Sequence, residues 1–315
     1  MPKPYYERGG VQLYHGRLQD ITPSFTEKGI RIGDFPYSAH THDKVRSNAR
    51  VDPLWSGGDG RVYKASKARK VDLGFEYLTP ELRRFAARES ARLASRFTLD
   101  FSDTESDWLW RTSLVAAGLD YYRTAFWRKV NSTPQFTGRI PAVAVEAITI
   151  CHTKGFLGGA KWNGGGRHGW YEQGHEESDF AAFTRHGGEL VYDVPIVLER
   201  FGQGKGEARV HTTQKPEALM TQLVEEFTNP GELIYDWTCG FATTAVAALK
   251  ASGGPRRAVL IEQDERWCEA AAKRLDAEIG GVGYTPQMKS VVKDDRGRVV
   301  KVVEKQTGFD FGGGR

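Results

Sequence analysis

The 315-residue sequence predicts an α/β protein built on a doubly wound sheet, a size that suits one large domain or a core with one inserted subdomain. Short apolar runs alternate with segments of helical periodicity along most of the chain. A strand that ends at Asp236 also leads through a turn of small residues into a helix. That arrangement is how an α/β sheet binds a nucleoside-type cofactor.

The elements of the first half follow from apolar strands and from helix-capping residues. Residues 11–16 and 29–35 read as strands. Residues 79–95 are expected to form a helix, because Thr79 can cap it and Pro80 suits its first position. The sequence then predicts a strand at 96–101, a helix at 105–118 that ends at Gly118, and strands at 121–130 and 145–153.

The second half repeats the alternation of helix and strand. It predicts a helix at 215–228, a turn and strand at 229–237, a helix at 243–252, a strand at 257–264 and a helix at 265–279. The tail alternates in hydropathy around "DDRG" (294–297), which indicates a terminal β-hairpin. We therefore divide the chain into a first α/β part at 1–154, an insertion at 155–210, a second α/β part at 211–283 and a hairpin and tail at 284–315.

Two segments interrupt this pattern. The insertion at 155–210 is rich in glycine, histidine and aromatic residues and lacks periodicity, so we expect a recognition module rather than sheet. The segment 38–75 is a long loop that could neutralise phosphates. Its basic residues are Lys44, Arg46, Arg50, Arg61, Lys64, Lys67, Arg69 and Lys70.

Composition excludes several classes of protein. Hydrophobic residues are 39% and charged residues 27%, which permits a packed core, and the net charge is +4. The three cysteines are widely separated, which argues against a disulfide framework, and no credible metal-ligand set accompanies the histidines. The first residues lack an apolar leader, and no apolar run approaches about 18 residues. We expect a cytoplasmic protein without a membrane partner.

The order of four elements resembles the amino-group DNA methyltransferases of the permuted β arrangement. These elements are "DFPY" (34–37), the insertion, "HTTQKP" (211–216) and "DWTCGFATT" (236–244). The segments "TPQFTG" (133–138) and "WNGGGRH" (162–168) are also similar to middle segments of phage and bacterial members. The resemblance covers nearly all of residues 11–280. It implies a Rossmann-like, S-adenosylmethionine-dependent methyltransferase sheet with an inserted target recognition region.

The resemblance also implies residue roles. In this family the motif carboxylate and the next backbone carbonyl accept the two N–H bonds of the target amine, which frees its lone pair for attack on the donor methyl. Asp34 and the carbonyl of Phe35 match these acceptors, Pro36 completes the motif, and Tyr37 would stack on the flipped base. The matching cofactor residues are Arg17, Thr213, Gln214, Lys215, Pro216, Asp236, Trp237, Thr238, Cys239, Gly240, Phe241, Ala242, Thr243, Thr244 and Glu262. In the insertion, DNA contacts are expected from Trp162, Asn163, Arg167 and His168.

Four features depart from the family pattern. Phe241 would place a ring at the lip of the donor pocket, and Ala242 replaces a glycine, at a cost of roughly 1–2 kcal/mol if the backbone is unchanged. Arg17 stands where an aspartate usually accepts from the donor adenine. Trp237 and Thr238 replace a Pro-Phe pair, and Phe35 replaces the first proline of the motif.

These departures leave the chemistry open. The leading hypothesis is methylation of adenine N6 in DNA, since cytosine-N4 members more often carry serine at the position of Asp34. A second hypothesis keeps the fold but uses a modified donor or another target, including cytosine N4. A third is an inactive DNA-binding protein on the same scaffold. Restriction, host regulation, evasion of host nucleases and a homodimer all stay open.

Overall fold

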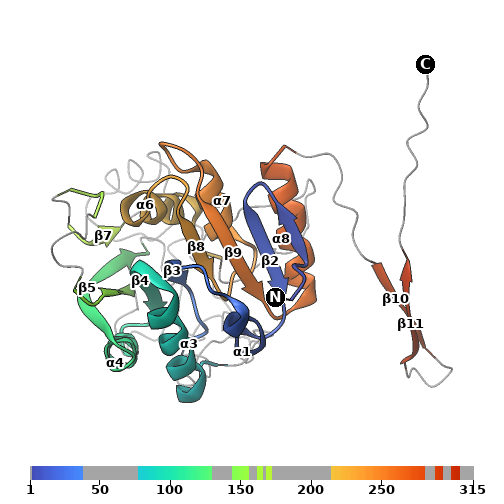
Figure 1. Ribbon diagram of the computed structural model, residues 1–315, viewed down its shortest axis with the longest axis horizontal. Helices are drawn as coiled ribbons and strands as arrows, with labels where there is room; N and C mark the ends of the chain where they lie inside the picture. Colours follow the sequence, from blue (N-terminus) through green and yellow to red (C-terminus); the bar gives the residue numbers. More distant parts are fainter. Residues whose placement is uncertain are drawn as a thin grey trace, which may run out of the picture.

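The structure is a computed structural model that describes residues 2–37, 77–129, 144–155, 162–165, 168–171, 214–280, 288–293 and 299–305. Within these residues nine strands form one sheet in the order β1-β2-β9-β8-β3-β4-β6-β5-β7, with helices on both faces (Figure 1). The predicted doubly wound α/β fold is confirmed.

The centre of the sheet is parallel, and its strands are largely buried apolar runs. It consists of β2 (Val11–His15), β9 (Arg257–Glu262), β8 (Leu233–Asp236), β3 (Gly29–Gly33) and β4 (Ala94–Ser102). Beyond β4, the antiparallel strands β6 (Val145–Thr153) and β5 (Leu119–Arg128) extend the sheet, and β7 (Trp170–Tyr171) pairs with β5. At the other edge, β1 (Tyr6–Arg8) pairs antiparallel with β2.

The helices divide into two layers, each with its own hydrophobic cluster. One face carries α6 (Glu217–Phe227), α7 (Thr243–Lys250) and α8 (Glu265–Glu278). The other carries α1 (Leu18–Ile21), the 3-10 turn η1 (Thr22–Ser24), α3 (Pro80–Leu93) and α4 (Asp107–Ala116).

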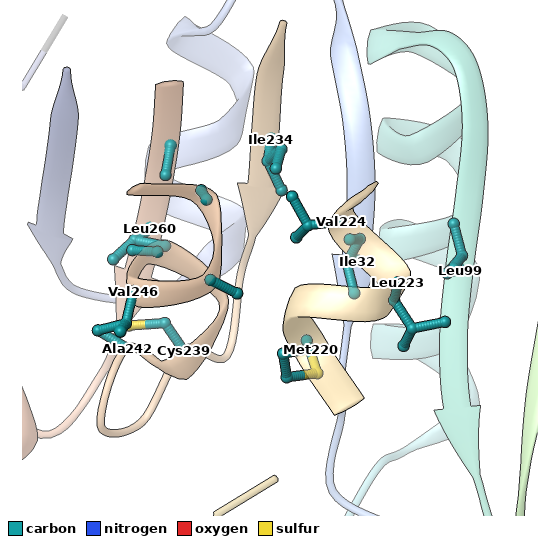
Figure 2. Close-up of a cluster of buried hydrophobic side chains, with 14 of the residues drawn as sticks. Ile32, Leu99, Met220, Leu223, Val224, Ile234, Cys239, Ala242, Val246 and Leu260 are labelled. Atoms are coloured by element: carbon teal, nitrogen blue, oxygen red, sulfur yellow. The ribbon is translucent and has the colours of Figure 1, made fainter. Parts of the chain in front are cut away.

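Figure 2 shows the first hydrophobic layer, with Leu223 and Val224 of α6 and Val246 of α7 close to strand residues such as Ile32 and Leu260. All five side chains are at most 1% exposed. Each such burial contributes about 1.5–3 kcal/mol, so this layer fixes the two helices whose amino-terminal ends flank the candidate site.

Three helix ends are capped, and of these caps Thr79 and Gly118 were predicted. Oγ1 of Thr79 accepts a hydrogen bond from the backbone N–H of Leu82, and Pro80 opens α3. Asp264 caps α8 by accepting from the backbone N–H of Arg266. Gly118 follows α4 with a φ of +107°, as predicted from its position at the end of that helix.

The structure adds short elements and corrects one expectation. The elements β1, α1, η1 and β7 were not predicted, because a run of two to four residues has no measurable period. The expectation that the insertion contains no sheet is wrong at β7, where Phe126 pairs with Trp170. The terminal hairpin is confirmed as β10 (Met288–Lys293) and β11 (Val299–Lys305). The basic loop at 38–75 lies outside the described residues.

None of the described helices is long and apolar enough to cross a membrane.

Candidate active site

The candidate site lies where two neighbouring parallel strands end. The strands β3 and β8 are paired, and the loop 34–37 follows the first as the turn 237–242 follows the second. The next strand of the sheet after β3 is β4, on one side of the pair, and the next after β8 is β9, on the other side. The two strands therefore form a topological switch point. Oγ1 of Thr238 donates to the carbonyl of Asp34 at 3.1 Å, which joins the loop and the turn directly.

Asp34 lies at one end of a chain of side chains with alternating negative and positive charge. Nζ of Lys215 lies 2.5 Å from Oδ2 of Asp34 and 3.3 Å from Oε2 of Glu146, and Glu146 also pairs with Lys129. The side chain of Lys215 is 8% exposed and that of Asp34 is 26% exposed, so only Asp34 is open to an approaching group. Lys129 and Glu146 were not predicted as site residues. Their only signal in the sequence is one charge directly after the strand β5 and one charge near the start of the strand β6.

Burial and charge act in opposite directions on the pKa values of this cluster. Burial raises the pKa of Asp34, and the ammonium of Lys215 opposes that rise. Burial would also raise the pKa of Glu146, but Lys215 and Lys129 outweigh it and hold that pKa at about 2. Burial would lower the pKa of Lys215, but the carboxylates of Asp34 and Glu146 raise it overall. Lys215 therefore stays protonated at neutral pH.

Tyr37 lies beside the same cluster. Its ring centroid is 5.8 Å from Nζ of Lys215, and burial and the neighbouring Glu146 raise the pKa of its hydroxyl. A hollow beside Pro36 and Tyr37 has a volume of only about 10 Å³, which is the space of about one water. A nucleobase is far larger, so we do not assign this hollow to one.

The turn 237–242 keeps a left-handed backbone at its end despite the loss of a glycine. Ala242 has a φ of 59° and a ψ of 33° directly before α7, and it is the only described non-glycine residue with positive φ. The left-handed backbone is thus kept although alanine replaces glycine, so the strain predicted for an unchanged backbone applies to Ala242. Gly240 also has positive φ, and its N–H donates to Oε2 of Glu262 at 2.9 Å. The ends of β8 and β9 are thus tied together.

Asp236 is a buried carboxylate at the end of β8. Oδ2 accepts from Oγ1 of Thr244 at 2.6 Å, and Oδ1 accepts from the N–H of Thr238 at 3.2 Å. Burial raises the pKa of Asp236 to about 7, although both hydrogen bonds favour the ionised form. A cation placed beside this carboxylate would stabilise its ionised form.

The expectation that the ring of Phe241 stands at the lip of a pocket is wrong. The residue is 6% exposed, and the guanidinium of Arg274 on α8 lies 4.7 Å from the ring centroid. Arg274 also donates to the carbonyl of Phe241 and to Oγ1 of Thr243, and it pairs with Glu217. Arg274 was not predicted as a site residue, and nothing in the sequence linked it to the turn.

The remaining donor-side residues are distributed as follows. Trp237 is 2% exposed, and Cys239 is also buried. Pro216 lies directly before α6 and Gln214 just upstream. Arg17 is exposed at the end of β2 and forms no ion pair with Asp236, with Glu262 or with any other described residue. Thr213 lies outside the described residues.

Two of the residues predicted to contact DNA pack against α6. The ring of Trp162 lies 6.1 Å from that of Phe227. Nδ2 of Asn163 donates to the carbonyls of Glu225 and Thr228 at 3.0 Å. These carbonyls lie at the carboxy-terminal end of α6, where they have no partner within the helix. His168 is exposed. Arg167 lies outside the described residues, as do the eight basic residues of 38–75.

Comparison with known sequences points to one family. The sequence model of a family described as DNA methylase, of the N6/N4 methyltransferase type, matches residues 116–273, half of the chain. The type II methyltransferase M.HinfI of Haemophilus influenzae is 26% identical over 169 residues, which cover 53% of this chain and 43% of that protein. The DNA adenine methyltransferase YhdJ of Escherichia coli (strain K12) is 38% identical over 66 residues, 21% of each chain. The matched region is thus less than half the length of these relatives.

Comparison with solved structures supports the fold. The crystal structure of an M1.HpyAVI–SAM complex superposes with a TM-score of 0.52 at 18% identity, covering 84% of this chain and 99% of that one. The PvuII DNA methyltransferase, which is cytosine-N4-specific, gives a TM-score of 0.50 at 12% identity, covering 86% and 88%.

Proposed function

Because the chain belongs to the DNA methylase family of the N6/N4 type, we propose that it transfers a methyl group from S-adenosylmethionine to an exocyclic amine of a DNA base, with adenine N6 as the target. The observation that carries the proposal is the contact of Thr238 with the carbonyl of Asp34 at 3.1 Å. It brings a carboxylate that can accept from an amine next to a turn of the kind that holds a nucleoside.

The roles on the acceptor side follow from the chemistry of the amine. An exocyclic amine is a poor nucleophile, because its lone pair is delocalised into the ring. Asp34 accepts one N–H bond and the carbonyl of Phe35 accepts the other, which moves the nitrogen toward tetrahedral geometry. As the nitrogen–methyl bond forms, the carbon–sulfur bond breaks with its electron pair going to sulfur, and the nitrogen releases a proton to water.

The residues of the turn fit a donor of this type. S-adenosylmethionine, when bound, supplies a methyl group made electrophilic by a positively charged sulfur. Asp236 is a buried carboxylate without a cationic partner among the described residues, and a cationic ligand suits it. Glu262 uses one lone pair on each oxygen for the N–H groups of Gly240 and Asp264, so each oxygen keeps another for a ribose hydroxyl.

An altered donor is the second candidate, and one observation favours it. Arg17 is exposed beside the end of β9, where Gly16 donates to the carbonyl of Glu262. An acidic group added to the donor would find a cation there. Asp236 and Glu262 need no altered donor, so the ordinary one stays our first choice.

The choice of adenine depends on Asp34, because serine is more frequent at this position in cytosine-N4 members. The names of the relatives divide, since YhdJ is called an adenine methyltransferase and the PvuII enzyme is cytosine-N4-specific. For DNA binding we propose the basic residues of 38–75, together with Arg167 and His168.

The test is mass spectrometry of nucleosides from DNA incubated with the protein and S-adenosylmethionine, paired with calorimetry of donor binding with and without DNA. N6-methyladenine is the expected product. N4-methylcytosine would overturn the choice of base, and donor binding without any product would favour an altered target. DNA binding without donor binding would leave only an inactive DNA-binding protein.

A further inference from the structure

A buried arginine lies directly beneath the candidate site. Arg31 is the central residue of β3 and is 2% exposed. Side chains alternate along a strand, so Arg31 shares a face with Gly33 and Phe35, toward α4. A Cβ on Gly33 would lie 2.4 Å from Nη1 of Arg31, so the glycine provides the space that the guanidinium occupies. Arg31 therefore reaches toward the end of its own strand, where the loop 34–37 begins.

Three aromatic rings surround the guanidinium. Its Cζ lies 5.7 Å from the ring centroid of Phe35, 5.6 Å from that of Trp110 on α4, and 5.2 Å from that of Trp237. Phe35 and Trp237 are the two residues that stand where the family pattern has proline. These two residues lie 202 positions apart in the sequence, yet their rings contact the same guanidinium. The two replacements of proline are therefore linked through one side chain.

Arg31 pairs with Asp100 of the neighbouring strand β4, and both side chains are at most 2% exposed. Nε and Nη1 of Arg31 and Oδ1 of Asp100 have no hydrogen-bond partner among the described residues. Breaking such a pair is costly, yet an apolar pair of similar volume would often be equally stable. Stability alone does not account for a charge at this position.

We propose that Arg31 is a positioning residue for methyl transfer that holds the loop 34–37 and the turn 237–242 at a fixed separation. Phe35 follows Asp34, and Trp237 precedes Thr238, so the cation acts on one neighbour of each residue in the Thr238–Asp34 hydrogen bond. The rings replace the fixed φ of the two prolines with packing against a common centre. This role rests on the proposed function, whereas the coupling of the two segments does not.

The test compares Arg31→Lys with Arg96→Lys. Lysine keeps a cation for Asp100 but loses the planar face against the rings. Arg96 is the control, because it too is an arginine that pairs with a carboxylate, that of Glu232, and lies over a ring, that of Phe97, although it is less buried than Arg31. It stands near the amino-terminal end of β4, away from the site.

For Arg31→Lys we expect kcat to fall roughly 10- to 100-fold while the donor KM stays within about threefold. Arg96→Lys should leave kcat within about threefold. Amide hydrogen exchange should accelerate in both segments, 34–37 and 237–242, in Arg31→Lys but not in Arg96→Lys. A fall in kcat without faster exchange, or faster exchange in one segment alone, would overturn the coupling.

A second pair of variants keeps the proposal testable if Arg31→Lys does not fold. Phe35→Leu and Trp237→Leu alter opposite segments, and no direct ring contact joins the two residues. Through Arg31, each single change should accelerate exchange in the other segment, and the double variant should lose less activity than the product of the single losses. Strictly independent effects would overturn the proposal. If the wild type transfers no methyl group, the proposed function fails, but the exchange measurements still decide the coupling.

Discussion

Nζ of Lys215 lies 2.5 Å from Oδ2 of Asp34, whereas Oδ1 of the same carboxylate has no hydrogen-bond partner among the described residues. One oxygen is thus held by a buried ammonium, and the other is available to an amine. Because Glu146 and Lys129 continue the chain of charges, the orientation of Asp34 depends on Lys215 of the "HTTQKP" segment and on two residues outside the recognised motifs.

Removal of the Asp34 carboxylate should abolish methyl transfer. For Asp34→Ala we expect a fall in kcat of at least about 100-fold, because one acceptor for the amine is lost, and DNA affinity within a few-fold of wild type. Product formation is measured by nucleoside mass spectrometry, and Asp20→Ala, at an exposed acid on α1, is the control. Near wild-type activity in Asp34→Ala would remove this residue from the mechanism.

Removal of the Lys215 charge should move the acid limb of the pH–rate profile. Without the ammonium, the pKa of Asp34 rises further, so Lys215→Met should shift the acid limb of kcat upward by roughly one to two pH units. Lys215→Arg keeps the cation and should shift it less. An acid limb that stays in place in Lys215→Met would show that this pair does not control the titration.

Donor affinity should depend on pH through Asp236. The pKa of Asp236 is raised to about 7, so below that pH the free protein carries a proton that a cationic donor must displace. Affinity should therefore rise by up to about tenfold per pH unit and level off above about pH 7, and Asp236→Asn should flatten the profile. Calorimetry from pH 5.5 to about 8.5 measures this. An identical slope in Asp236→Asn would exclude the carboxylate as the cause.

The same raised pKa has a consequence for stability. A carboxyl whose pKa is higher in the folded protein contributes stability that is fully present below its unfolded pKa. That contribution is lost as the pH rises through about 7, so Asp236 should lower the free energy of unfolding toward neutral pH. As the pH rises through this range, the free energy of unfolding of wild type should therefore fall relative to that of Asp236→Asn, which has no carboxyl to ionise at this position.

The strain at Ala242 should be measurable. Ala242→Gly relieves a left-handed alanine and should raise the free energy of unfolding by about 1 kcal/mol. The control is Ala247→Gly inside α7, which should lower it by about 1 kcal/mol. Denaturant titration gives both values. Destabilisation by Ala242→Gly would mean that packing around the alanine methyl outweighs the backbone strain.

DNA affinity should depend on salt through the basic loop. If Lys64, Lys67, Arg69 and Lys70 each neutralise a phosphate, the log–log slope of affinity against salt carries about −0.9 per contact. Replacing all four with glutamine should flatten it by about three or less. An unchanged slope would place the phosphates elsewhere on the protein.

The sequence predicted the sheet and its long helices, because most of these strands and helices are long enough to show a clear period. It also predicted that Asp34 and the turn after Asp236 lie together, from the resemblance in motif order. It could not predict the partners of buried charges. Arg31 in "GIRIG" and Glu146 in "VEAITI" are single charges in apolar runs, and their meaning depends on side chains from distant strands. For the same reason Phe241 was misplaced, since only α8 supplies the arginine that covers it.

The pairing of β3 with β8 bears on how the chain folds during synthesis. Ile30 pairs with Ile234, 204 residues further along, so the middle of the sheet closes only after the second α/β part has left the ribosome. Contacts between such distant segments form late and slowly, because a long loop must close first. The junction of Thr238 with Asp34 is one of these contacts. The candidate active site therefore forms only after the turn 237–242 has been synthesised.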